Sequence, residues 1–220
     1  MANNRPPFQP NCFYHAYNRA VGDESVFYEE KNFNYFLSKV DLHICPIADI
    51  FAFCLMPNHF HFLVRTKGME EVSGWWKEYE AEKRKAAERQ GEEYPNRTFN
   101  YQKVISHQFG TLQNSYTKSL NKLYSRMGGL FSQSIQRKTI DSEDYLRQAI
   151  NYIHRNPVHH EFCKDPGEWK YSSYNSYLSS KPTKVKSREG VLLFGGRDSF
   201  LQFGRTVDEI GYAVQMDLYY

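Results

Sequence analysis

One stretch of this sequence decides the fold: Phe51-Ala-Phe-Cys-Leu-Met-Pro-Asn-His-Phe-His-Phe-Leu-Val64. Its apolar first half predicts a buried strand, Pro57 can interrupt the hydrogen-bond ladder, and the β-favouring second half resumes it. Because side chains alternate along a strand, His59 and His61 leave one face while Phe60 and Phe62 leave the other, toward a core. Neutral imidazole is the commonest protein ligand of divalent metals, so the histidines are candidates for half of a metal site. Polar side chains on the solvent-exposed face of a half-buried strand would have the same pattern.

The sequence on either side alternates between strand and helix patterns. These patterns predict, in order, a strand over 12–19, a helix over 29–43, the two strands of the quoted stretch, helices over 69–90 and 104–124, a strand over 130–140 and a helix over 143–155. The last helix should end before Pro157, because proline lacks an N–H donor and disfavours helical geometry in the residue before it. Short helical segments and a frayed tail are expected after residue 169.

Length and composition fit one core domain with extensions. The chain has 220 residues, of which 40% are hydrophobic, and those of its 17 Tyr and 16 Phe that the core does not need could stack on bases. The net charge of +3 is compatible with an anionic partner without requiring one. We expect a disordered start over 1–12, a core domain over 13–178 with a charged insertion at about 69–101, and a C-terminal extension over 179–220.

The cysteines and the N-terminus bear on where the protein is found. The four cysteines lie far apart and form no C-x-x-C pair, which is typical of reduced thiols. The first ten residues lack an apolar signal region, and no apolar run approaches the length that spans a bilayer. We therefore expect a reduced, cytoplasmic protein with no membrane partner.

A second group of candidate residues lies on the helix before Pro157. Tyr152 and Asn156 are four residues apart and share a helix face. If that face met the two histidines, the Asn156 oxygen could complete three neutral ligands, with open positions for a phosphate oxygen and water. Such a set suits Mg²⁺ or Mn²⁺. The Tyr152 phenol could then attack phosphorus and hold the strand as a phosphotyrosine, although a buried tyrosine held by its hydroxyl would have the same pattern.

Several motifs taken together resemble one known family. Four segments, in order along the chain, resemble the HUH single-tyrosine transposases and, within them, the REP-associated tyrosine transposases: Tyr14-His-Ala-Tyr-Asn-Arg19, Leu55-Met-Pro-Asn-His-Phe-His-Phe-Leu-Val64, Tyr152-Ile-His-Arg-Asn-Pro-Val158 and Trp169-Lys-Tyr-Ser-Ser-Tyr174. The resemblance runs from about residue 13 to about residue 177. It implies an α+β fold with a ferredoxin-like, or RRM-like, antiparallel sheet backed by helices.

The resemblance also implies a function and a site. It suggests an enzyme that cuts and rejoins single-stranded DNA at hairpins through a 5′-phosphotyrosine, with Tyr152 as nucleophile. His59 and His61 would bind the metal, and Asn156 would take the third-ligand position that other single-tyrosine transposases fill with glutamine. The charged, tryptophan-bearing insertion departs from the family pattern and could be a DNA-binding arm or an oligomer contact. The resemblance leaves open whether the protein is a monomer or a homodimer, and whether the tyrosine acts in cis or in trans.

Basic side chains outside the histidine–tyrosine group are candidates for holding the DNA backbone. Most lie on the predicted helix over 104–124 and on the strand that follows it. They are Arg19, Lys118, Lys122, Arg126, Arg137 and Lys138. The same residues on a solvated surface would need no ligand.

Three alternatives stay open at this stage. A non-catalytic single-stranded nucleic-acid-binding module could use the same sheet, with aromatic side chains as stacking platforms. A metal-dependent phosphodiesterase would use activated water and form no covalent adduct. A zinc site from His154, His159, His160 and Cys163 is a rival metal set, although its spacing matches no common zinc pattern.

Overall fold

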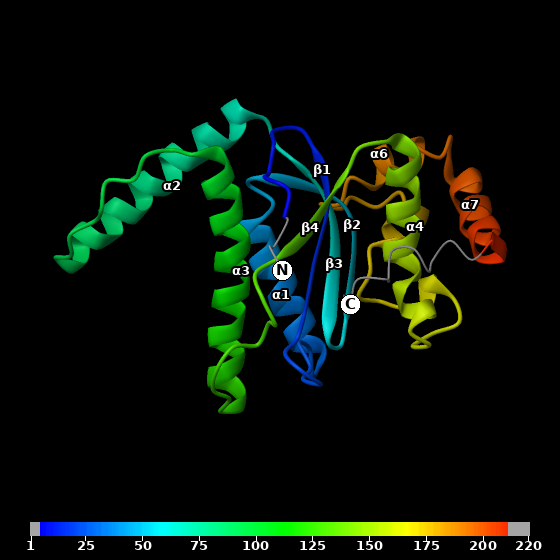
Figure 1. Cartoon of the computed structure of the whole chain (residues 1–220), viewed down its shortest axis with the longest axis horizontal. Coiled ribbons are helices and arrows are strands. Elements are labelled where there is room, and N and C mark those ends of the chain that lie inside the picture. The colour runs from blue at the N-terminus through cyan, green and yellow to red at the C-terminus, as the bar shows by residue number, and fades with distance from the viewer. Residues whose placement is uncertain (1–4, 211–220) are drawn as a thin grey trace.

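The computed structural model describes residues 5–210 and is built around one antiparallel sheet (Figure 1). Its elements are β1 (Phe13–Arg19), α1 (Glu30–His43), β2 (Ala48–Met56), β3 (His59–Thr66), α2 (Met69–Gln90), α3 (Tyr101–Tyr124), β4 (Gln136–Ile140), α4 (Glu143–His159), the 3-10 turn η1 (Pro166–Glu168), α5 (Tyr174–Leu178), α6 (Ser187–Leu192) and α7 (Arg197–Ile210). The four strands lie in the order β2-β3-β1-β4. With α1 and α3 as its two connections, this is the ferredoxin-like order, so the predicted α+β fold class is confirmed.

The strand register places polar side chains of three strands next to one another. β1 lies between β3 and β4, and every pair of neighbouring strands is antiparallel. Arg19 lies opposite His59, Tyr17 lies opposite His61, and His15 lies opposite Lys138 of β4. Because opposite residues in a ladder share a face, all of these side chains leave the same side of the sheet.

The other side of the sheet carries the larger hydrophobic core. Phe60 and Phe62 of β3 and Tyr14 of β1 are buried there, as the strand alternation predicts. They pack beneath α1 and α3, which lie together on this side of the sheet (Figure 1). Phe60 and Phe62 therefore anchor β3, and their burial fixes which side chains of β3 point to the opposite face.

The histidine face is not exposed to solvent, so the alternative of two polar side chains on a solvent-exposed face does not hold. α4 lies across it and forms a second core, in which Ile150 and Ile153 meet Leu63 of β3 and Ala52 of β2. His61 is 0% exposed and His59 is 7% exposed. The reason is the apolar face of α4, which needs a partner surface and finds it on this side of the sheet.

The segment from Trp169 to Tyr174 closes the open edge of β2. The Leu55 N–H donates to the Tyr171 carbonyl at 2.9 Å, and the Ser173 N–H donates to the Phe53 carbonyl at 3.0 Å. The Trp169 indole N–H adds a bond to the Leu55 carbonyl at 3.0 Å. This motif of the resemblance therefore covers a sheet edge that would otherwise be unpaired.

Ser173 also ties this edge to α4. Its hydroxyl accepts from the Phe53 N–H at 2.8 Å and lies 2.8 Å from Nε2 of His154. His154 is fully buried and stands on the side of α4 that faces Tyr177 and Phe200. One serine thus links β2 to the helix that covers the histidines.

Three local predictions are wrong. Residues 5–12 are not disordered, because Phe8 is buried against Tyr14 and Phe109, whereas residues 1–4 lie outside the described part of the chain. The strand expected over 130–140 is formed only by residues 136–140. α4 continues through Pro157 to His159, because in the last turn the missing N–H removes only one helical bond. The frayed tail expected at the C-terminus falls on residues 211–220, outside the described part.

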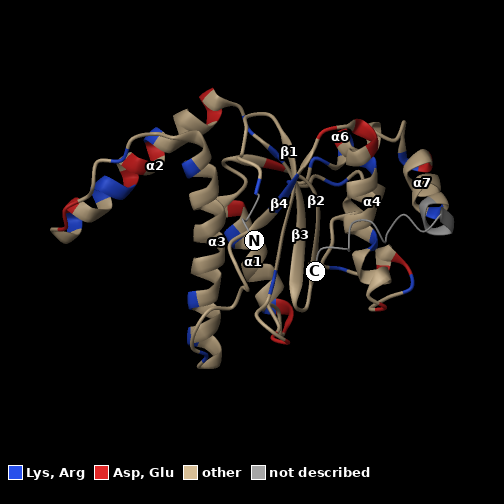
Figure 2. Cartoon of the chain, in the orientation of Figure 1, with Lys and Arg blue, Asp and Glu red and all other residues tan. Residues whose placement is uncertain are grey.

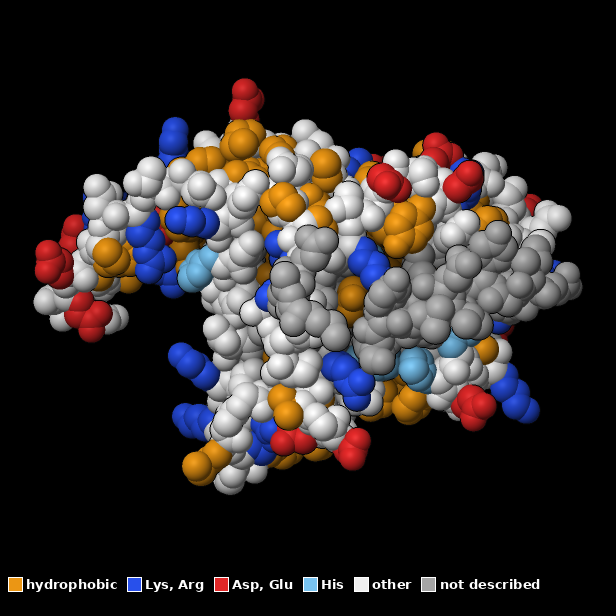
Figure 3. Space-filling model, in the orientation of Figure 1, with side chains coloured by type: hydrophobic (Ala, Val, Ile, Leu, Met, Phe, Trp, Pro, Cys, Tyr) orange, Lys and Arg blue, Asp and Glu red, His pale blue; other side chains and the backbone are white. Residues whose placement is uncertain are grey.

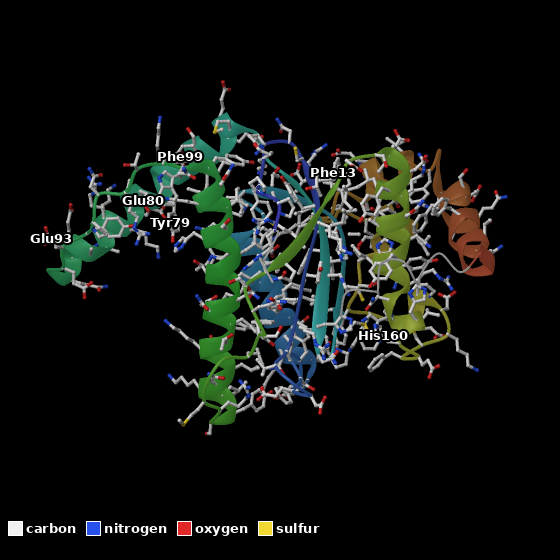
Figure 4. All side chains as sticks on the ribbon, viewed as in Figure 1. Phe13, Tyr79, Glu80, Glu93, Phe99 and His160 are labelled. Atoms are coloured by element: carbon white, nitrogen blue, oxygen red, sulfur yellow. The ribbon has the colours of Figure 1, made fainter. Side chains whose placement is uncertain are left out.

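The charged stretch after β3 forms an arm. α2 leaves the body of the molecule and the chain returns along it to α3 (Figure 1), with both signs of charge along the helix (Figure 2). Tyr79, Glu80 and Phe99 lie at the join of helix and returning chain (Figure 4), where Glu80 accepts from the Tyr94 hydroxyl at 3.0 Å. Hydrophobic side chains are exposed over the start of α2 (Figure 3), where Met69 is 47% exposed.

Among residues 5–210, no helix is long and apolar enough to cross a membrane.

The burial of His154 predicts a pH dependence of stability. Burial lowers the pKa of His154 from 6.5 to about 3, so between these values the unfolded chain takes up a proton that the folded protein does not. Stability should therefore fall as the pH drops below 6.5, by about 1.4 kcal/mol per pH unit for each such histidine. We expect His154→Gln to flatten this slope relative to the unchanged protein, as measured by urea unfolding at several pH values. Equal slopes for the two proteins would contradict the assignment.

Candidate active site

α4 brings Tyr152 and Asn156 onto the histidines of β3. His59 Nε2 lies 2.9 Å from Asn156 Oδ1. The Tyr152 ring meets the His61 ring edge to face, with 5.5 Å between centroids, and the rings of the two histidines are 5.1 Å apart. The four residues singled out in the sequence therefore lie together in one buried cluster, contributed by one helix and one strand of the same chain.

The hydrogen bonds between His59 and its two neighbouring asparagines leave one donor of Asn156 unused. His59 Nδ1 lies 2.7 Å from the Asn58 side-chain oxygen, while Nε2 faces the oxygen of Asn156. A neutral imidazole carries one N–H and cannot donate to both oxygens. The Asn156 amide nitrogen is buried without a hydrogen-bond partner. Turning that amide over would only exchange the unpartnered nitrogen for an unpartnered oxygen.

His59 Nε2 and Asn156 Oδ1 are placed so that both could contact one cation. With its proton on Nε2, His59 donates a hydrogen bond to Asn156 Oδ1 at this distance; with the proton on Nδ1, the two lone pairs at 2.9 Å suit ligands of one ion. Neighbouring ligands of an octahedral ion with bonds of about 2.1 Å are roughly 3 Å apart. The donors are neutral imidazole nitrogen and amide oxygen, which fit Mg²⁺ or Mn²⁺ better than a closed zinc site.

The rival zinc set is not assembled. His154 points to Ser173, whereas the rings of His159 and His160 lie near those of Tyr152 and His59 on another side of α4. Cys163 and the other cysteines are free thiols. In the described part of the chain, no three or more His, Cys, Asp or Glu side chains come close enough together to hold a metal. The group of His59, His61 and Asn156 is of a different kind, because Asn156 contributes an amide oxygen.

His15 belongs to the cluster, and the sequence analysis missed it. Its Nε2 lies 2.9 Å from Nδ1 of His61, with both side chains buried. If His61 Nδ1–H donates in this bond, its Nε2 carries the lone pair that a metal needs, and His15 fixes that tautomer and the orientation of the ring. The alternation of β1 puts His15 and Arg19 on one face, but only the pairing of β1 with β3 shows which face.

Burial keeps the inner histidines neutral. It lowers the pKa of His15 to about 3, with Lys138 adding to the effect. Burial also holds the pKa of His61 well below its ordinary value, and the neighbouring histidines lower it further. At neutral pH both rings are therefore uncharged, which is the form that binds metals.

A cavity of about 500 Å³ opens onto His59 from the end of the sheet. It is lined by Arg19, Asn58, His59, His160 and Phe162, among others. His160 stands at the end of α4 (Figure 4), with its ring 5.0 Å from that of His59. Arg19 lies opposite His59 in the ladder and lines the cavity together with Asp23, so the opening carries both a guanidinium and a carboxylate.

The predicted DNA-binding residues are spread over the molecule. Arg19 and Lys138 lie on the histidine face, with Lys138 opposite His15. Lys118 and Lys122 are exposed on α3, on the other side of the sheet. Arg126 is bound to Glu24 and Asn121 in the same region. The remaining member, Arg137, also faces away from the histidines, with its guanidinium over the Phe8 ring at 4.2 Å.

Comparisons with known proteins support the fold. No protein-family profile matches the sequence, and no curated protein matches it significantly. Among solved structures, one described as a REP-associated tyrosine transposase bound to a REP hairpin is similar, with a TM-score of 0.55 and 13% sequence identity. The match covers 83% of this chain and 89% of that one. The resemblance to this family is therefore confirmed for the fold.

Proposed function

We propose that this protein cuts and rejoins single-stranded DNA at hairpins, with Tyr152 as the nucleophile. The observation that carries the proposal is the meeting of α4 and β3, which sets Tyr152 beside His61 and Asn156 2.9 Å from His59. A REP hairpin is what the similar solved structure binds, and this supports the choice of DNA. His59, His61 and Asn156 would hold Mg²⁺ or Mn²⁺, which would polarise the phosphoryl group and stabilise the leaving 3′-oxygen.

The side chains around the phenol have separate tasks. Tyr152 forms the new bond to phosphorus and gives up its hydroxyl proton. His15 is too weak a base for that proton, because burial lowers its pKa to about 3. His159 is the acceptor that we assign, since its ring lies 6.1 Å from that of Tyr152 on the same helix. Arg19 and Lys138, which leave the same face of the sheet, would bind the phosphates on either side.

The tyrosine acts on the histidines of its own chain in this proposal. α4 lies on β3 of the same chain, and both Tyr152 and Asn156 belong to that helix. A single chain thus contains every residue of the proposed site. Exchange of α4 between two copies would require the second hydrophobic core, including Ile150 and Leu63, to open.

A non-catalytic binding module is the second candidate. Tyr152 is only 4% exposed and belongs to the apolar cluster beneath α4, as a tyrosine that serves only in packing would. A binding module would hold the same DNA and would never form a covalent bond to it. The two functions therefore differ in one measurable product.

Tyr152→Phe tests the nucleophile. The variant should keep hairpin affinity, because it loses only the hydroxyl, but should give neither a cut strand nor an adduct that survives SDS. Tyr145→Phe is the matched control, since Tyr145 lies two turns earlier on α4 and is also partly buried. We expect the control to cut DNA as the unchanged protein does. Peptide mapping of the adduct to another tyrosine would overturn the assignment.

Substitutions at Asn156 and His59 test the metal ligands. We expect Asn156→Ala and His59→Ala to weaken Mn²⁺ binding at least tenfold, as measured by electron paramagnetic resonance. Asn156→Asp should retain binding, because a carboxylate oxygen also suits Mn²⁺. His107→Ala serves as the histidine control, since His107 is exposed on α3. Unchanged Mn²⁺ binding by Asn156→Ala would remove the amide from the ligand set.

A further inference from the structure

We propose a second DNA subsite, for an unpaired nucleotide, on the side of the sheet opposite to the histidines. It deepens the proposed function and rests on it. The site is a cavity of about 490 Å³ between α3 and the chain that leads from α3 into β4, and Figure 1 shows these two segments side by side. Its volume lies within the usual range of small-ligand pockets. Arg5, Gly110, Gln113, Phe131 and Arg137 are among its lining residues.

Two guanidinium groups give this cavity a positive lining. The lining includes Arg5 and Arg137 and contains no Asp or Glu. Arg5 Nη1 donates to the Ile135 carbonyl at 3.4 Å, and Arg137 Nε donates to the Pro6 carbonyl at 2.6 Å. Each of these bonds uses one of the five N–H donors of a guanidinium. Within residues 5–210, neither arginine forms an ion pair with a carboxylate.

Gln113 supplies an independent sign of a ligand. Its side chain is 6% exposed, and its Oε1 accepts from the Ile135 N–H at 3.1 Å, which fixes the amide. The amide nitrogen is buried with no hydrogen-bond partner. A buried N–H donor without an acceptor is unfavourable, so the pocket favours a ligand that brings one. Phosphate oxygens and the carbonyl groups of bases are such acceptors.

The strand register connects this pocket to the candidate active site. Arg137 and Lys138 are neighbours on β4, and their side chains leave opposite faces of the sheet. β4 is an edge strand, so an extended strand of DNA can pass around it. Lys138 lies opposite His15, which contacts His61. A single strand that leaves the pocket at Arg137 therefore reaches the phenol of Tyr152 by way of Lys138.

Gly110→Leu tests the subsite by filling it. Gly110 is a helical glycine of α3 that lines the pocket, and an added Cβ there would meet nothing within 4 Å. The new side chain should therefore occupy the cavity without harming the fold. Gly74→Leu is the matched control, because Gly74 is a helical glycine of α2 whose added Cβ also meets nothing within 4 Å. It lies outside the pocket lining.

The probes are a fluorescein-labelled DNA hairpin with random single-stranded extensions and the same hairpin without them. We expect Gly110→Leu to weaken binding of the extended hairpin at least tenfold, which corresponds to about 1.4 kcal/mol, and to leave the blunt hairpin unchanged. Gly74→Leu should change neither affinity. Gln113→Glu should act like Gly110→Leu, because it keeps the acceptor for Ile135 and replaces the donor with a negative charge.

Equal affinity of the Gly110→Leu and Gly74→Leu proteins for the extended hairpin would overturn the subsite, as would equal binding of both probes by the unchanged protein. Loss of affinity in Gly110→Leu together with absence of any Tyr152 adduct in the unchanged protein would support the subsite and overturn catalysis. A normal adduct with unaltered affinity in Gly110→Leu would support catalysis and overturn the subsite. The failures of the two proposals are therefore distinguishable.

Discussion

The burial of both faces of β3 is the constraint on which the rest of the structure depends. Strand alternation sends Phe60 to one side and His61 to the other, and each side is covered by helices. A strand covered on one side would leave the histidines in water, with ordinary pKa values and freely moving rings. Because α4 covers them, they are enclosed together with Tyr152, and burial holds the pKa of His61 well below its ordinary value. The low pKa of His61 and the contact between its ring and Tyr152 therefore follow from how α4 packs on the sheet.

The position of α4 is set by residues that carry no chemistry themselves. Ser173 joins the backbone of Phe53 to His154, and the Tyr177 hydroxyl donates to the Phe51 carbonyl at 2.9 Å. A reactive group must be held within about 0.5 Å of its working position, which a single layer of contacts rarely achieves. The serine and tyrosines that follow Trp169 thus have a structural role, which is to anchor α4 to β2.

The sequence predicts what depends on local patterns and fails where distant segments meet. The two strands around Pro57, the bounds of α2 and the shared face of Tyr152 and Asn156 all follow from periodicity. The His15–His61 contact could not be predicted, because it requires the pairing of β1 with β3 across 46 positions. Whether the helix face of Tyr152 and Asn156 meets the histidines stayed open in the sequence for the same reason. The expected end of α4 before Pro157 is wrong, because the last turn of a helix tolerates a proline.

The weak net charge of +3 limits how this protein could hold DNA. Non-specific affinity comes from phosphate neutralisation and rises with the number of basic contacts, so a chain with few excess cations gains little from it. The predicted basic residues also lie on both sides of the sheet rather than on one surface. In the proposed function, affinity would depend on a few cationic groups beside cavities, such as the exposed Arg19 next to His59 and the half-buried arginines near Gln113. Recognition of this kind depends on the path of a strand around β4 and less on charge density.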